Sequence, residues 1–289
     1  MGILNLTPDS FSDGGELPTL ESAVARGIRM VEAGAGILDL GGESTRPGAR
    51  EVPVEEEAAR VLPVLEALVR EVAVPLSVDT RKAEVARRAL DAGAAIVNDV
   101  SALTHDPEMA GVVAERRAGL VLMHMRGTPA DMGERAVYRD LVEEVGGELE
   151  ASVARAREAG VPDAALVLDP GIGVAKTPAQ SFRLIRELER LGELGFPLMV
   201  GASRKSFLGA LLQVPPRRRV TAGAVVAALA WERGARVFRT HDVEATVHAL
   251  RTARAVAGEE VPRAGGEGSP GSGGPGPSTP QGNEAGAVP

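Results

Sequence analysis

Cysteine is absent from this chain of 289 residues, which excludes disulfide bonds and metal centres held by cysteine. Aromatic residues make up only 2%, with a single Trp and a single Tyr. A surface that stacks nucleic-acid bases on aromatic rings is therefore not expected. The formal net charge of -8 also argues against a nucleic-acid partner, because the only basic cluster is Arg217–Arg219.

Long apolar runs are missing as well. No stretch approaches the roughly 18 consecutive apolar residues of a membrane-spanning helix. The first residues do not form the basic and apolar segments of a secretory signal peptide either. Together with the lack of cysteine, these features lead us to expect a cytoplasmic protein with no membrane partner.

Lysine and asparagine are both rare in this composition. They occur only as Lys82, Lys176, Lys205, Asn5, Asn98 and Asn283. Asn5 and Asn98 both stand at the ends of strand-like runs. Where a composition has nearly eliminated a residue type, we interpret survivors at such positions as specifically required.

Apolar runs of strand length alternate with segments of helical spacing. The runs are nearly continuous, which indicates strands buried on both faces, as in a parallel sheet. Strands are expected at about 3–7, 36–41, 75–79, 95–100, 119–125, 165–169, 197–202 and 236–240. Helices are expected at about 20–33, 55–72, 82–92, 107–116, 138–159, 178–193, 221–233 and 243–257.

Eight such repeats favour the α/β class and a closed (β/α)8 TIM barrel, which takes roughly 250 residues. An open doubly wound sheet remains the structural alternative, because pairing of the last strand with the first cannot be read from sequence. We expect one barrel domain at 1–257. The segment 258–289, rich in Gly, Pro and Ser, is expected to be a disordered tail without a catalytic role.

Polar side chains stand at the ends of the expected strands. Asp79, Asn98 and Asp169 end three of them, and Lys205 follows a fourth. In a closed barrel the carboxyl ends of all strands share one rim. Two carboxylates, a carboxamide and an ammonium suit a flat edge of alternating donors and acceptors, as in a pterin or guanine. The alternative is that Asp and Asn only cap strand ends or helix starts, which we favour less for four residues from separate strands.

A second group comes from the last and first strands, which are neighbours in a barrel. Arg239 and His241 suit an anion such as phosphate, and the amide oxygen of Asn5 suits Mg²⁺. No cluster of His, Asp and Glu resembles a zinc site, and none is predicted. Three long segments after strands, at 7–19, 41–54 and 203–220, are expected to be binding loops on the same rim.

Some tempting signals have plainer interpretations. Gly171-Ile172-Gly173 lacks the third glycine of a dinucleotide fingerprint. Ser203 and Ser206 lack the elbow motif of a serine hydrolase.

Longer strings around these residues resemble the signatures of dihydropteroate synthase. Residues 1–15 (Met-Gly-Ile-Leu-Asn-Leu-Thr-Pro-Asp-Ser-Phe-Ser-Asp-Gly-Gly) resemble its opening signature, and 38–48 (Leu-Asp-Leu-Gly-Gly-Glu-Ser-Thr-Arg-Pro-Gly) its second. Further strings match in order at 77–80, 97–100, 123–129, 169–173, 201–209 and 239–243. The resemblance covers residues 1 to about 257.

The resemblance implies an enzyme of folate biosynthesis and a sulfonamide target. Such an enzyme condenses 6-hydroxymethyl-7,8-dihydropterin pyrophosphate with p-aminobenzoate, giving 7,8-dihydropteroate and pyrophosphate. It also implies Mg²⁺ as cofactor and a homodimer formed through helices near the end of the domain.

By this resemblance the site residues divide among the ligands. The pterin is bound by Asp79, Asn98, Asp169 and Lys205. The pyrophosphate is held by Asn5, Arg239 and His241, with Asn5 also on Mg²⁺. The p-aminobenzoate pocket includes Thr45, Arg46 and Ser206. Catalytic roles are expected for Asp79, Lys205, Arg239 and His241.

The chain departs from the family pattern after Asp169-Pro170-Gly171-Ile172-Gly173. There the family usually has Phe-Gly-Lys, and this chain has Val174-Ala175-Lys176. The missing Phe commonly packs against p-aminobenzoate. Two rival functions stay open: another pterin-binding barrel, such as the folate-binding domain of a corrinoid methyltransferase, and a binding protein of the same fold without activity.

Overall fold

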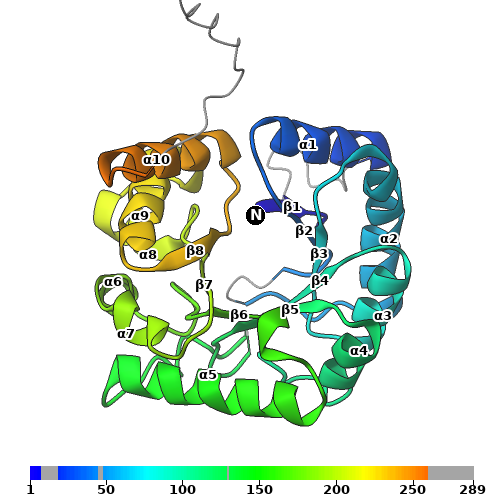
Figure 1. Cartoon of the computed structure of the whole chain (residues 1–289), viewed down its shortest axis with the longest axis horizontal. Coiled ribbons are helices and arrows are strands. Elements are labelled where there is room, and N and C mark those ends of the chain that lie inside the picture. Colours follow the sequence, from blue (N-terminus) through cyan, green and yellow to red (C-terminus); the bar gives the residue numbers. More distant parts are fainter. Residues whose placement is uncertain (8–18, 45–47, 129, 260–289) are drawn as a thin grey trace, which may run out of the picture.

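The computed structural model describes residues 1–7, 19–44, 48–128 and 130–259. Eight parallel strands follow one another around a central axis, in the order of the sequence (Figure 1). They are β1 (Gly2–Asn5), β2 (Leu38–Gly41), β3 (Leu76–Asp79), β4 (Ile96–Asp99), β5 (Gly119–Met123), β6 (Leu166–Asp169), β7 (Leu198–Val200) and β8 (Ala235–Phe238). Each coincides with a strand that the sequence predicts, to within one or two residues at each end.

The barrel closes between its last and first strands. Gly2 forms a parallel bridge with Thr240, just beyond β8. The Ile3 N–H donates to the Thr240 carbonyl at 2.9 Å, and the Thr240 N–H donates to the Met1 carbonyl at 2.9 Å. These bonds confirm the predicted (β/α)8 barrel and rule out the open doubly wound sheet.

The ladder aligns the carboxyl ends of the first strands at one level. Asn5 is the register partner of Gly41, Gly41 that of Asp79, and Asp79 that of Asn98. Side chains that are far apart in the sequence therefore start from adjacent backbone positions at one end of the barrel.

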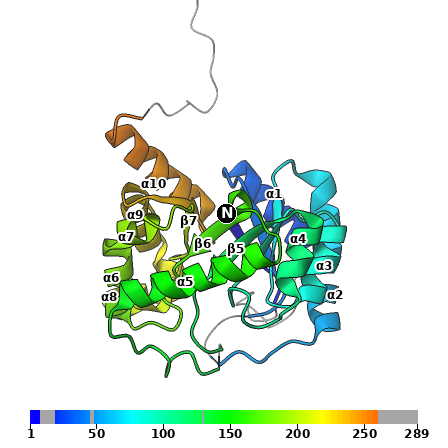
Figure 2. The same cartoon turned by 60° about the horizontal axis from the view of Figure 1, so that its bottom comes forward.

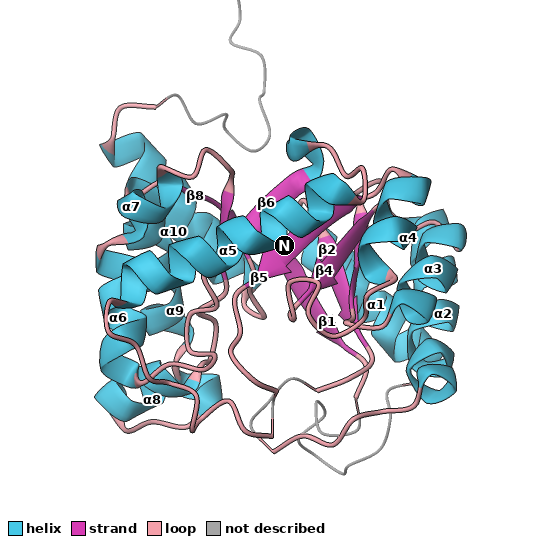
Figure 3. Cartoon of the chain, turned by 90° about the horizontal axis from the view of Figure 1, so that it is seen from below, coloured by secondary structure: helices cyan, strands magenta, loops and turns pink. Residues whose placement is uncertain are grey.

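Helices enclose the strands, with α5 crossing beside β5 and β6 (Figure 2). Their bounds are α1 (Leu20–Glu32), α2 (Val54–Glu71), α3 (Ala83–Asp91), α4 (Met109–Arg116), α5 (Leu141–Glu158), α6 (Pro178–Arg186), α7 (Leu188–Gly192), α8 (Ser206–Leu212), α9 (Val220–Glu232) and α10 (Val243–Val256). Figure 3 shows the same enclosure from a perpendicular direction. In α2 the buried Ala58, Val61, Leu65 and Leu68 recur at spacings of three and four, which turns one apolar face to the sheet.

Two helical regions differ from the prediction. The expected helix 178–193 is divided at Glu187 into α6 and α7. The segment 203–220, expected to be a loop, contains α8 and a short 3-10 turn at Pro216–Arg218. Seven residues are too few for a periodic signal, and α8 ends where Gln213 takes a left-handed conformation (φ +53°) before two prolines.

The start of α6 is fixed by a capping box. Thr177 accepts from the backbone N–H of Gln180, and the Gln180 side chain accepts from the N–H of Thr177. Pro178 occupies the first helical position, where a missing N–H costs nothing.

No helix among the described residues is long and apolar enough to cross a membrane. The expected tail lies outside the described residues from 260 onwards, as does most of the loop 7–19.

Candidate active site

The centre of the site is a guanidinium held between two carboxylates. Arg239, just after β8, donates from Nε to Asp39 Oδ2 at 2.6 Å and from Nη2 to Asp79 Oδ2. Asp39 and Asp79 come from β2 and β3 and are both buried. Three strands therefore meet in one charged cluster inside the barrel, on the side where β3 ends.

Asn98 of β4 extends this cluster. Its amide nitrogen donates to Asp39 Oδ2 at 3.2 Å, and only about 1% of its surface is exposed. Asn98 Oδ1 and Asp39 Oδ1 are buried without a hydrogen-bond partner among the described residues. Buried polar atoms of this kind are costly to leave unpaired, so they point to a ligand that supplies donors.

Asp169 and Lys205 form the opposite side of the same end. Asp169 Oδ1 accepts from the Gly171 N–H at 2.7 Å. Lys205 Nζ donates to the Ile172 carbonyl at 2.6 Å. Both side chains are thus fixed by one loop, which follows β6. Gly171 has φ +67°, a left-handed conformation that favours glycine, and a Cβ there would lie 2.1 Å from the His124 carbonyl oxygen.

Burial dominates the electrostatics of these groups. Loss of hydration raises the pKa of Asp79 to about 7, with Arg239 opposing the rise and Asp39 adding to it. Burial also raises the pKa of Asp169, although Lys205 opposes this rise. The pKa of Lys205 falls to about 8 for the same reason, against the attraction of Asp169. Groups with pKa values brought this close to neutrality are characteristic of functional sites.

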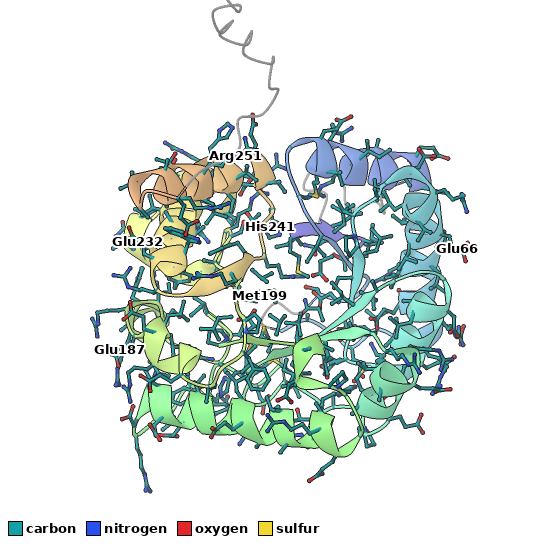
Figure 4. The ribbon with its side chains drawn as sticks, in the orientation of Figure 1. Glu66, Glu187, Met199, Glu232, His241 and Arg251 are labelled. Atoms are coloured by element: carbon teal, nitrogen blue, oxygen red, sulfur yellow. The ribbon has the colours of Figure 1, made fainter. Side chains whose placement is uncertain are left out.

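His241 lies beyond β8, toward the barrel interior, whereas Glu66 and Glu232 point outward (Figure 4). Its Nδ1 lies 3.1 Å from Ser203 Oγ, which also accepts from the His241 backbone N–H. Desolvation, helped by Arg239, lowers the pKa of His241 to about 3. A neutral imidazole whose Nδ1 accepts from Ser203 carries its hydrogen on Nε2 and can donate it to an anion.

Ser203 also lies 3.5 Å from Asp242 Oδ2, so Ser, His and Asp gather here. In a hydrolytic triad the imidazole lies between the serine and the carboxylate. Here the serine lies between the other two, and Asp242 pairs with Arg204 at 3.0 Å. This geometry agrees with the sequence interpretation that no serine hydrolase is present.

Asn5 stands at the end of β1, beside the carboxylate of Asp79. A Cβ placed on Gly41 would lie 3.8 Å from Asn5 Oδ1 and 3.6 Å from Asp79 Oδ2, so both oxygens face the space that Gly41 leaves. Mg²⁺ takes oxygen ligands and usually keeps several waters, so a carboxamide beside a carboxylate fits it. No group of three or more His, Cys, Asp and Glu suited to a metal occurs in the part of the chain that is described.

Of the three residues predicted for the p-aminobenzoate pocket, one lies among the described residues. Thr45 and Arg46 lie outside the described residues. Ser206 is exposed in the first turn of α8, directly after Lys205.

The described ends of the loop 41–54 are bonded to the start of α3, the helix that follows Asp79. Glu43 accepts from the Val52 N–H at 3.0 Å and from Arg81 Nε at 3.0 Å. It also pairs with Lys82, whose ammonium reaches Glu57 at 2.5 Å. The two ends of the loop and the start of α3 are therefore joined through one carboxylate.

Sequence reasoning missed Asp39 as a site residue. It sits inside an apolar strand rather than at its end, and its partner Arg239 is 200 residues away. The only available signal was an acidic residue in a strand expected to be buried on both faces. Asp99, by contrast, has the plain capping role: it accepts from the Ser101 and Leu103 N–H groups at 2.8 and 2.7 Å.

The sequence of this chain is similar to those of known pterin-binding proteins. A sequence model described as pterin binding enzyme matches residues 1–241. The dihydropteroate synthase of Synechocystis sp. is 48% identical over 257 residues, which is 89% of each chain.

Solved structures match the fold at similar coverage. The Yersinia pestis dihydropteroate synthase in complex with a sulfonamide drug gives a TM-score of 0.85 at 43% identity, covering 89% of this chain and 93% of that one. The Xanthomonas albilineans dihydropteroate synthase with 4-aminobenzoic acid gives 0.83 at 48% identity, covering 90% and 93%.

Proposed function

The chain belongs to the dihydropteroate synthase family of pterin-binding enzymes, and from that membership we propose the reaction and the roles of its residues. It is a transferase that condenses 6-hydroxymethyl-7,8-dihydropterin pyrophosphate with p-aminobenzoate, giving 7,8-dihydropteroate and pyrophosphate. The observation that carries the proposal is the convergence of Asp39, Asp79, Asn98 and Arg239 on one buried point, opposite Asp169 and Lys205.

The pterin would occupy the space between these two groups. Its 2-amino-4-oxo edge offers N–H donors to a carboxylate such as Asp169 and a carbonyl oxygen to an ammonium such as Lys205. Asn98, which has an orphaned Oδ1 beside a donating nitrogen, suits a ring that both donates and accepts. A flat ligand with such an edge satisfies buried polar atoms that have no partner in the protein alone.

The leaving group would face Arg239 and His241. Breaking the C–O bond to pyrophosphate leaves an anion, which the guanidinium and a neutral Nε2–H stabilise. Asn5, with Asp79 nearby, would hold Mg²⁺, which when bound offsets the charge of the pyrophosphate oxygens.

Asp79 would stabilise the pterin methylene as it becomes cationic. Without substrate its pKa is near 7, because burial outweighs the effect of Arg239. A cation forming beside it lowers that pKa and favours the carboxylate when it is needed. The aniline then attacks the methylene and loses its proton readily to solvent.

A direct assay tests the activity. The protein is incubated with the pterin pyrophosphate, p-aminobenzoate and Mg²⁺, and both pyrophosphate release and dihydropteroate formation are followed. Product in equal amounts with released pyrophosphate is expected. Pterin binding without product would favour the non-catalytic or methyltransferase-type alternatives. A sulfonamide should compete with p-aminobenzoate, as the Yersinia pestis complex suggests.

The proposal includes a homodimer. Val225 and Leu229 lie one turn apart on α9, a largely apolar helix, and both are exposed. An apolar helical face of this kind usually marks an interface. Light scattering at micromolar concentration should give twice the mass of 29.9 kDa, and Leu229→Glu should reduce it to one chain. A monomeric wild-type protein would refute this assignment.

A further inference from the structure

The loop after β6 is held by a ring of side chains that the reaction described above does not use. We name Lys176, His124, Glu148, Arg126 and Tyr138 the loop clamp. Lys176 comes from the loop itself, His124 follows β5, and the others come from the segment after β5 and from α5.

One half of the loop clamp is a hydrogen-bonded chain. Lys176 Nζ lies 2.9 Å from His124 Nδ1 and donates to the Val174 carbonyl at 3.0 Å. His124 Nε2 lies 2.9 Å from Glu148 Oε2. An ammonium that donates to Nδ1 requires the tautomer with hydrogen on Nε2, which then donates to Glu148. Each donor in this series of hydrogen bonds therefore faces an acceptor.

The other half returns to the same loop. Arg126 Nε donates to Glu148 Oε1 at 2.9 Å, and its guanidinium lies 4.1 Å from the centre of the Tyr138 ring. Tyr138 donates its hydroxyl hydrogen to the Ala175 carbonyl at 3.0 Å. The loop clamp therefore binds the loop through two successive backbone carbonyls, those of Val174 and Ala175.

The same loop sets two residues of the pterin site. Its Gly171 N–H binds Asp169, and its Ile172 carbonyl binds Lys205. Gly171 is packed so closely on the His124 backbone that no side chain would fit between them. A shift of the loop would therefore move the partners of Asp169 and Lys205 together.

We propose that Lys176 is a positioning residue for pterin binding, acting through the loop clamp and not by contact with substrate. The inference rests on the proposed function, since it assigns Asp169 and Lys205 to the pterin. Through His124 and Val174, Lys176 fixes the loop whose backbone aims the Asp169 carboxylate and the Lys205 ammonium. Misplacement of binding groups by about 1 Å is enough to cost roughly 100-fold in activity.

The test measures binding of 6-hydroxymethylpterin by isothermal titration calorimetry. Lys176→Met removes the ammonium. The control, Arg116→Met, removes a cation that pairs with Asp91 at 2.9 Å and Glu115 at 2.7 Å near the starts of β4 and β5, at the opposite end of the barrel from the site. The dissociation constant should rise about 10-fold or more in Lys176→Met and stay within about 2-fold of wild type in Arg116→Met.

Tyr138→Phe keeps the ring and loses only the bond to Ala175, so it tests the loop clamp if Lys176→Met does not fold; a smaller rise, about 3-fold, is expected. Unchanged pterin binding in folded Lys176→Met, or in Tyr138→Phe if Lys176→Met does not fold, would overturn the proposal. An equal rise in Arg116→Met would also overturn it, because the effect would then be general destabilisation. Failure of the wild-type protein to bind the pterin would instead count against the proposed function.

Discussion

Arg239 and Asp39 form an ion pair inside the barrel, with Nε and Oδ2 2.6 Å apart, although the residues lie 200 positions apart in the chain. Burial acts to lower the pKa of the guanidinium, but Asp39 and Asp79 outweigh it and raise that pKa above its usual value. Arg239 therefore stays protonated, and its guanidinium links β8 to β2 and β3.

Removing one partner of this pair should be costly for stability. Asp39→Asn keeps the shape but leaves Arg239 with one carboxylate, and the free energy of unfolding should fall by about 3 kcal/mol. Urea denaturation measures this value. The exposed pair of Arg157 and Asp163 offers a control, since Asp163→Asn should change stability far less than Asp39→Asn does. Equal losses of unfolding free energy in the two variants would show that the buried pair contributes no more to stability than the exposed pair.

Asp79→Asn should separate catalysis from binding. The amide keeps the size of the side chain but cannot stabilise a cation as a carboxylate does. We expect kcat to fall by about 100-fold or more, while the dissociation constant for the pterin changes by less than about 10-fold. Single-turnover kinetics and calorimetry measure the two quantities. Equal losses would contradict the proposed role.

The raised pKa of Asp79 also predicts a pH dependence of stability. In the folded protein this pKa is about 7, against 3.8 for the unperturbed group. The folded state therefore binds the proton more tightly than the unfolded chain, so this contribution to stability is present at low pH and is lost as pH rises through 7. Asp79→Asn does not titrate, and its Tm should fall less than that of wild type between pH 5 and pH 8. Parallel Tm curves for the two proteins would refute this.

Ala175 occupies a backbone position that suits glycine. Its φ is +49°, in the left-handed region, and the family usually has Gly there. Ala175→Gly should therefore stabilise the protein by about 0.5–1 kcal/mol. Ala156→Gly, at a buried position within α5, should instead destabilise it by about 1 kcal/mol. Thermal unfolding distinguishes the two, and destabilisation by both would show that the left-handed position carries no strain.

Much of the architecture could be predicted because it is local. Continuous apolar runs and helical spacing each depend on a few neighbouring residues, and the eight strands were found where the sequence indicates. The ends of the strands located Asp79, Asn98 and Asp169 for the same reason.

The remaining features depend on contacts between distant segments. The helix α8 is too short to show a period, and Asp39 acquires its role only from Arg239 across the barrel. The loop clamp likewise joins Lys176 to His124, 52 residues earlier. Such pairings are decided by the closed geometry of the sheet and cannot be read from spacing.

The closure of the barrel through Gly2 and Thr240 has a consequence for biosynthesis. As a ribosome makes the chain from its first residue, β3 to β7 emerge well before β8. The residues assigned to the pterin lie on these strands or just after them. Asn5 is synthesised before all of them, but Arg239 and His241, its partners in the pyrophosphate site, are synthesised after β8. The half of the site that would hold pyrophosphate can therefore form only when translation has passed the last strand.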